Sequence, residues 1–112
     1  METLFTKIIN KEIPADIIFE DDLSLVFKDI NPQAPTHLLI IPKKPISKLS
    51  DASEEDKELL GHLMWVAGEI SRELGLDETF RLVTNNGAKA GQSVFHLHLH
   101  LLSGRPLQWP PG

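Results

Sequence analysis

Apolar and polar residues follow one another along the chain in patterns that predict several β-strands and one long helix. Two runs rich in β-branched and aromatic residues, 17–19 and 23–27, flank a short polar connection, which is typical of a β-hairpin. Residues 37–41 form a third apolar run between two prolines, which limit a strand because proline lacks a backbone donor. Residues 80–84 and 94–102 also have strand character.

The long segment at residues 54–74 has the periodicity of an amphipathic helix. Asp51 or Ser53 is available to cap its start, and Gly75 to end it. Its apolar residues recur every three or four positions, at Leu59, Leu63, Val66, Ile70 and Leu74. A helix of ~30 Å covers one face of a sheet, and the connections between most strands are short enough for antiparallel pairing. The sequence therefore predicts an α+β fold in a single domain, residues 1–112.

Histidine and leucine alternate without a break in the middle of the last predicted strand. Successive side chains of a strand point to opposite faces, so His96, His98 and His100 are expected on one face and the leucines between them on the core side. A half-buried strand that merely tolerates histidine is the ordinary explanation. It is disfavoured because three neighbouring imidazoles would repel one another as they protonate.

A metal site is a second explanation of this row, because a His-x-His pair on a strand supplies two zinc ligands. The outer pair, His96 and His100, is separated by ~13 Å along an extended strand, so all three histidines would converge on one ion only if the strand bent markedly. A two-histidine site completed by His37 or Asp29 is the metal-binding alternative.

Nucleophilic attack on phosphorus makes the fullest use of the row. One imidazole attacks while its neighbours neutralise phosphate charge and protonate the leaving group. His98 is the predicted nucleophile because it is central and has a partner on either side. The glycine-bearing loop at residues 85–93 leads directly into the row, and residues 91–93 are expected to close around a phosphate.

Composition excludes several other functions. The absence of cysteine removes thiolate and disulfide chemistry, and the formal net charge of -5 argues against a nucleic acid polymer as partner. Lys43 and Lys44 lack the glycines of a P-loop. No segment approaches ~20 consecutive apolar residues and the first residues do not resemble a signal peptide, so we expect a cytoplasmic protein without a membrane partner.

The motif from His96 to Leu102 resembles the histidine triad (HIT) family, in which three histidines alternate with apolar residues and two more apolar residues follow. Residues 5–15 and 29–37 and the tail at 109–112 are similar to the histidine triad nucleotide-binding protein (Hint) branch, so the resemblance covers nearly the whole chain. It implies an antiparallel five-stranded sheet with one long and one short helix, which dimerises into a ten-stranded sheet.

The resemblance also implies an activity, that of a purine nucleoside phosphoramidase without a metal or other cofactor. The middle histidine attacks the α-phosphorus of an adenosine or guanosine 5′-phosphoramidate, and water then releases the monophosphate from the nucleotidyl-histidine. Carried over by motif position, His98 is the nucleophile, His100 and Ser93 contact the phosphate or leaving group, and His37 and His96 orient neighbours and relay protons.

The remaining site residues implied by the resemblance bind the nucleotide. Asp29 accepts the ribose hydroxyls. The phosphate pocket is completed by Asn85, Gly91 and Gln92. The apolar slot for the base is formed by Phe5, Ile8, Ile13, Phe27 and Ile30. Ordinary core packing is the alternative for each of these apolar residues.

Two tryptophans are candidates for a homodimer interface. Trp65 lies off the apolar stripe of the predicted helix, and Trp109 in the tail has little local core to enter. A nucleotide-binding adaptor with incidental hydrolysis is the alternative function. Other HIT branches act on dinucleoside polyphosphates or transfer nucleotides to sugars, and the motif alone does not separate them.

Overall fold

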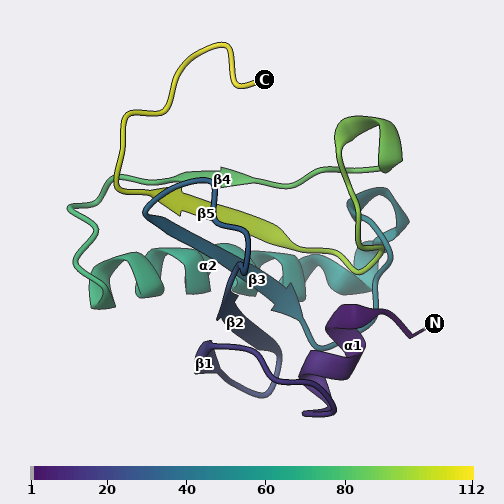
Figure 1. Ribbon diagram of the computed structural model, residues 1–112. Helices are drawn as coiled ribbons and strands as arrows, with labels where there is room; N and C mark the ends of the chain where they lie inside the picture. The colour runs from purple at the N-terminus through teal and green to yellow at the C-terminus, as the bar shows by residue number, and fades with distance from the viewer. Residues whose placement is uncertain (1) are drawn as a thin grey trace.

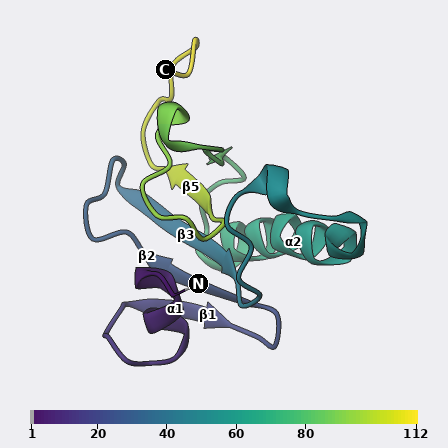
Figure 2. The same ribbon diagram turned by 90° about the vertical axis from the view of Figure 1, so that its right-hand side faces the viewer.

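The computed structural model describes residues 2–112 as a five-stranded antiparallel sheet with one helix on each face (Figures 1 and 2). The strand order is β1-β2-β3-β5-β4. The strands are β1 (Ile17–Glu20), β2 (Ser24–Lys28), β3 (Thr36–Pro42), β4 (Arg81–Val83) and β5 (Leu99–Ser103), and the helices are α1 (Leu4–Ile9) and α2 (Lys57–Glu73). Single 3-10 turns lie at Leu49–Asp51, Glu54–Asp56 and Ala88–Ala90. The predicted α+β class with one long and one short helix is confirmed.

The central strand β3 divides the core into two layers. Leu38 and Ile40 pack in the cluster shared with α2, whereas Leu39 and Ile41 pack in the cluster shared with α1. Successive side chains of a strand face opposite sides, and both faces of β3 are covered, so the strand is an unbroken apolar run rather than an alternating one. The hairpin of β1 and β2 forms as predicted.

Helix α2 begins three residues later than predicted, after the 3-10 turn Glu54–Asp56. Ser53 caps this 3-10 turn rather than α2 itself, whose N-cap is Asp56: the Ser53 main-chain amide donates to Oδ2 of Asp56 at 2.9 Å. Gly75 ends the helix at a φ of 63°, and the amide of Leu76 donates to the Ser71 carbonyl at 3.1 Å. Glycine adopts this left-handed conformation without steric cost. No helix within residues 2–112 is long and apolar enough to cross a membrane.

The last strand starts at Leu99, so the prediction that it begins at residue 94 was wrong. Two distant contacts bend the chain before it. The amide of Leu97 donates to the carbonyl of Ile46, and the His96 Nε2 lies 2.7 Å from the carbonyl oxygen of Pro42. His96 is only 1% exposed, so its ring needs this partner. Leu97 still packs on the α2 side, as the alternation predicts.

Candidate active site

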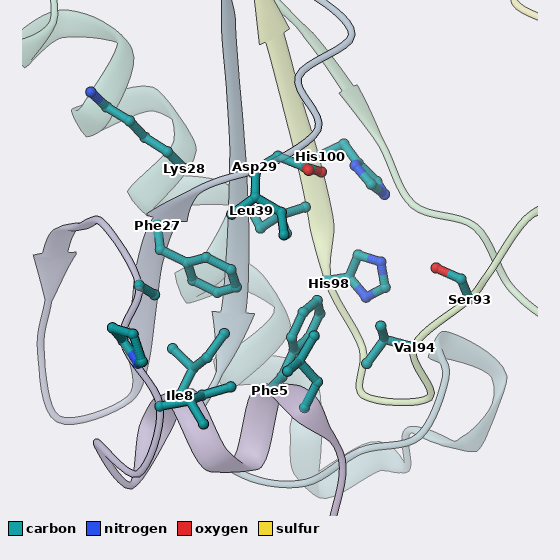
Figure 3. A pocket seen from close by; sticks show the side chains of 15 residues that line it. Phe5, Ile8, Phe27, Lys28, Asp29, Leu39, Ser93, Val94, His98 and His100 are labelled. Carbon is teal, nitrogen blue, oxygen red and sulfur yellow. The ribbon is translucent and has the colours of Figure 1, made fainter.

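A cavity of about 400 Å³ opens between α1, the end of β2 and the segment that leads into β5 (Figure 3). Its apolar end lies against α1, where the Phe5 and Phe27 rings meet edge to face at 5.4 Å between centroids. Its other end is polar and holds Asp29, Ser93, His98 and His100. The lining residues are Leu4, Phe5, Ile8, Ile13, Pro14, Ala15, Phe27, Lys28, Asp29, Ile30, Leu39, Ser93, Val94, His98 and His100. The five predicted base-slot residues all belong to this lining.

His98 lies in the polar end of the cavity and meets the apolar end at Phe5, with 5.1 Å between the ring centroids. Its Nδ1 is 2.7 Å from the carbonyl oxygen of His96, so Nδ1 carries the proton and donates. Within residues 2–112 no hydrogen bond reaches its Nε2, which keeps a free lone pair. Burial lowers the pKa of His98, so the imidazole is neutral near pH 7. A neutral imidazole with an unshared Nε2 lone pair is a competent nucleophile.

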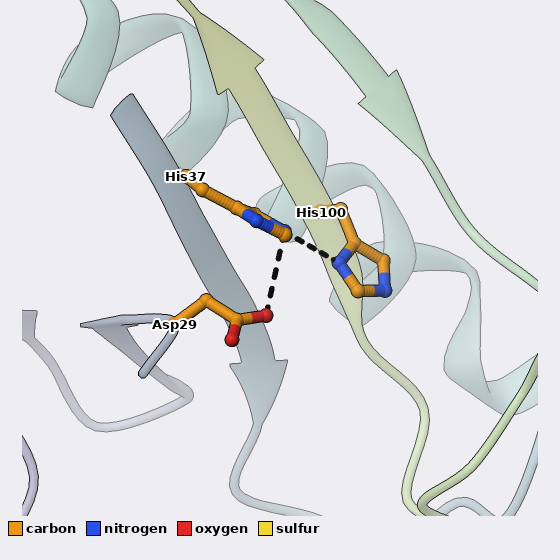
Figure 4. Close-up of side chains that lie close together, drawn as sticks. All are labelled: Asp29, His37 and His100. Atoms are coloured by element: carbon orange, nitrogen blue, oxygen red, sulfur yellow. Dashed lines mark hydrogen bonds and ion pairs between the residues drawn. The ribbon is translucent and has the colours of Figure 1, made fainter. Parts of the chain in front are cut away.

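His37 and His100 form a second polar unit, with Asp29 beside them (Figure 4). His37 lies opposite Leu102 in the β3–β5 register and is therefore a diagonal neighbour of His100 on the same face. The amide of Gln33 donates to Nδ1 of His37 at 3.0 Å, so the His37 proton is on Nε2. That Nε2 lies 2.9 Å from Nδ1 of His100 and 3.4 Å from Oδ2 of Asp29.

These contacts determine where His100 carries its proton. Because its Nδ1 accepts from His37, the single proton of neutral His100 is on Nε2. Burial, together with the neighbouring His98 and His37, lowers the pKa of His100 to about 4, although Asp29 acts to raise it. Burial likewise lowers the pKa of His37. His100 thus offers an Nε2–H donor next to His98, at 5.0 Å between ring centroids.

Asp29, His37 and His100 also form the one cluster among residues 2–112 with ligand atoms for a metal ion, all within 4.8 Å of one another. A zinc ligand must offer a lone pair, and His37 could do so at Nε2 only by moving its proton to Nδ1. The Gln33 amide already points a hydrogen at Nδ1. The donor set therefore does not fit a metal ion in this arrangement, and it fits a hydrogen-bonded neutral pair.

The predicted phosphate-loop residues separate into two groups. Ser93 lines the cavity, whereas Asn85, Gly91 and Gln92 lie outside its lining. The buried Gln92 amide binds the chain itself: its Oε1 accepts from the Gly87 amide, and its Nε2 donates to the carbonyls of Ser47 and Val94. Gly91, at a φ of 105°, packs near the Asn85 side chain. The geometry gives Gln92 a role in holding this loop, and phosphate contact by these three residues stays a prediction.

Sequence reasoning missed several residues that line the cavity. Leu39 is one of them: it pairs with His100 in the sheet and faces the α1 side. Its place two residues after His37, on the same face of a strand, was the available signal. Leu4, Pro14, Ala15, Lys28 and Val94 are the other unpredicted lining residues. His96, in contrast, is a predicted site residue that lies behind the cavity, with its ring 6.1 Å from that of Phe5.

The two interface candidates are both exposed in the single chain. Trp65 is 56% exposed and stacks on the His62 ring of α2 at 5.9 Å between centroids. Trp109 in the tail is 81% exposed. Neither residue packs in the two core clusters.

A family model described as the HIT domain matches residues 10–107. The chain belongs to the HIT domain family. This HIT chain is 62% identical over 111 residues to an uncharacterized HIT-like protein of Synechocystis sp., covering 99% of this chain and 97% of that protein. It is 50% identical over 112 residues to the 14 kDa zinc-binding protein of Zea mays, covering 98% of this chain and 88% of the maize protein.

Solved structures of the HIT family have the same fold. A HIT family hydrolase from Legionella pneumophila matches with a TM-score of 0.96 and 51% identity, over 99% of this chain and all of the other (100%). The histidine triad nucleotide-binding protein from Candida albicans matches with a TM-score of 0.83 and 32% identity, over 99% of this chain and 85% of that chain. The chain therefore has the fold of a HIT family hydrolase.

Proposed function

We propose that this HIT protein is a purine nucleoside phosphoramidase that acts through a covalent nucleotidyl-histidine at His98. The observation that carries the proposal is the pairing of a free Nε2 lone pair on His98 with an Nε2–H donor on the adjacent His100. A nucleophile and a proton donor side by side are the two groups that cleavage of a P–N bond needs. The name of the Candida relative, a nucleotide-binding protein, supports a nucleotide as substrate.

In the first step, the Nε2 lone pair of His98 forms a bond to the α-phosphorus while the P–N bond breaks. The leaving nitrogen takes the Nε2 proton of His100 and departs as the neutral amine. Nucleotidylated His98 becomes cationic, and a proton from solvent replaces the one that His100 has given up, so the His37–His100 pair stays neutral beside Asp29. The His96 carbonyl, which accepts from Nδ1, stabilises the cationic ring.

In the second step, water attacks the same phosphorus and releases one proton to solvent. The P–N bond to His98 breaks and its Nε2 regains the lone pair. The hydroxyl of the water ends on the nucleoside monophosphate, and its other proton balances the one taken from solvent in the first step, so both histidines recover their starting protonation. His37 keeps its donor on Nδ1 of His100 throughout, so the pair behaves as one proton-transfer unit.

The shape of the cavity supports a nucleoside in one orientation. The apolar end suits the flat face of a purine, and the Asp29 carboxylate in the polar end suits the ribose hydroxyls. Asp29 is held by the Asn31 amide, which donates to its Oδ1 at 2.8 Å, so its other oxygen faces the His37–His100 pair. Ser93 stands at the phosphate end.

We also propose that two copies form a homodimer. Edge strand β4 is available to extend the sheet to ten strands, and Trp65 on α2 and Trp109 in the tail would be buried by the second copy. A nucleotide-binding adaptor remains the alternative function, since it would use the same cavity without needing the reactive pair.

Steady-state hydrolysis of an adenosine 5′-phosphoramidate bearing a fluorogenic amine, with a chelator present, tests the proposal. The wild type should turn over, and His98→Ala should lose activity on the order of 10⁴-fold or more. His62→Ala is the matched control, because His62 pairs with Asp21 away from the cavity. Tight AMP binding without turnover by the wild type would favour the adaptor, and activity that zinc restores after chelation would favour a metal enzyme.

A further inference from the structure

Thr84, one residue beyond β4, donates its hydroxyl to the main-chain carbonyl of His98 at 2.9 Å. Its side chain is half-buried and does not line the cavity. Thr84 therefore touches the backbone of the proposed nucleophile without being placed to touch a substrate.

The sheet leaves this carbonyl without a strand partner. The β3–β5 ladder begins at the Ile40–Leu99 pair, and the β4–β5 ladder begins at the Val83–His100 pair. His98 precedes both pairs, so neither neighbouring strand provides its carbonyl with a ladder hydrogen bond. A buried carbonyl that loses its only partner pays a desolvation cost and tends to turn toward another donor.

The Thr84 bond complements the bond that holds the His98 ring. The ring is held from the preceding side, where Nδ1 donates to the His96 carbonyl at 2.7 Å. The peptide on the following side is held by Thr84. Together the two bonds restrict rotation of residue 98 about its Cα, and the direction of Nε2 depends on both.

We infer that Thr84 is a positioning residue, whose hydroxyl fixes the peptide after His98 so that Nε2 points at the phosphorus. This inference rests on the proposed function, because it assigns a reaction that His98 performs. It predicts an effect on the rate of nucleotidyl transfer to His98 rather than on substrate affinity, since Thr84 lies outside the cavity lining. A misdirected nucleophile lowers the rate even when the substrate binds normally.

The test compares Thr84→Val, which keeps the shape and removes the hydroxyl, with Thr84→Ser, which keeps the hydroxyl. Single-turnover formation of nucleotidyl-enzyme and steady-state kcat should both fall about three- to tenfold in Thr84→Val, the range of one lost hydrogen bond, with KM unchanged. Thr84→Ser should stay within about twofold of the wild type. Thr79→Val is the matched control, because its exposed hydroxyl bonds to the Asp77 carbonyl away from the site.

Each measured rate is divided by the folded fraction of that variant, determined by circular dichroism. Thr84→Ala replaces Thr84→Val if Thr84→Val does not fold. Wild-type rates in the variant without the hydroxyl, or an equal loss in Thr84→Ser, would overturn the inference. So would a loss that appears only in KM. A wild type without turnover would instead refute the phosphoramidase proposal, so the two failures are distinguishable.

Discussion

The main-chain amide of Gln33 donates to Nδ1 of His37 at 3.0 Å, and this contact determines the proton positions across the polar end of the cavity. It forces the His37 proton onto Nε2, which in turn donates to His100 and leaves the His100 proton facing the cavity. A backbone amide cannot be titrated near neutrality, so the arrangement holds across the physiological pH range. The direction of proton donation is thus built into the loop between β2 and β3.

Removing His37 should disable this donor without removing the nucleophile. In His37→Ala the Nδ1 of His100 loses its partner, so the His100 proton is free to occupy either nitrogen. We expect kcat to fall by ~100-fold or more, the usual contribution of a positioned proton donor, with a smaller change in KM. Steady-state kinetics on the folded variant measure this. Activity within a few-fold of the wild type would show that His37 does not set the proton of His100.

Arg105 should affect the His37–His100 pair indirectly, through its contact with Gln33. Its guanidinium donates to the Gln33 carbonyl through Nε at 3.1 Å and Nη2 at 3.0 Å, which ties the Gln33 turn to the end of β5. Because Arg105 is exposed, Arg105→Met should fold and lower kcat only about two- to fivefold. Arg72→Met is the control, since Arg72 pairs with Glu69 on α2. Equal rates in the two variants would exclude a role for the Gln33 anchor.

The apolar end of the cavity should control affinity for the base. Ile13 and Ile9 are both half-buried and pack against the same apolar cluster, but only Ile13 lines the cavity. Ile13→Ala should raise KM for a purine phosphoramidate by roughly tenfold with little change in kcat, because the lost contact is made equally before and during reaction. Ile9→Ala should leave KM near the wild-type value. A KM that rises equally in both variants would indicate general loosening of the core.

Acid should destabilise the protein in a window set by its buried histidines. Burial lowers the pKa of His37, His96 and His98 below the usual 6.5, and that of His100 to about 4. Below pH 6.5 the unfolded chain binds protons that the buried histidines of the folded chain do not bind. The free energy of unfolding is therefore highest above pH 7 and decreases toward pH 4. Urea unfolding at a series of pH values measures the slope, which should be shallower in His100→Asn. Stability that is constant or rises from pH 7 to pH 4.5 would contradict these pKa directions.

The sequence was sufficient for the architecture because local patterns encode it. The spacing of apolar residues predicted α2, and the alternation of histidine with leucine predicted that Leu97 and its counterparts face the core. The pattern failed at residues 94–98, where distant partners bend the chain: Pro42 offers a carbonyl to His96, and Ile46 offers one to Leu97. A strand pattern describes a residue's neighbours and not the contacts across the fold.

The candidate site was predictable only in part, for a related reason. The row around His98 is visible as a motif, but His37 lies 63 residues from its partner His100, and only the resemblance to the HIT family gave it a catalytic role rather than that of a possible metal ligand. The glycine-bearing loop suggested a phosphate contact for Gln92, whereas its buried amide is engaged by three main-chain groups. Hydrogen-bond partners of this kind follow from tertiary packing, which spacing does not reveal.

The central claim is that His98 carries the nucleotide covalently. Intact mass spectrometry of the protein, mixed with an adenosine 5′-phosphoramidate and denatured within the first turnover, measures this directly, and peptide mapping locates the adduct. The account predicts one added nucleoside monophosphate per chain on the peptide that contains His98, present in His62→Ala and absent in His98→Ala. Turnover by the wild type without any adduct, or an adduct that persists in His98→Ala, would contradict it.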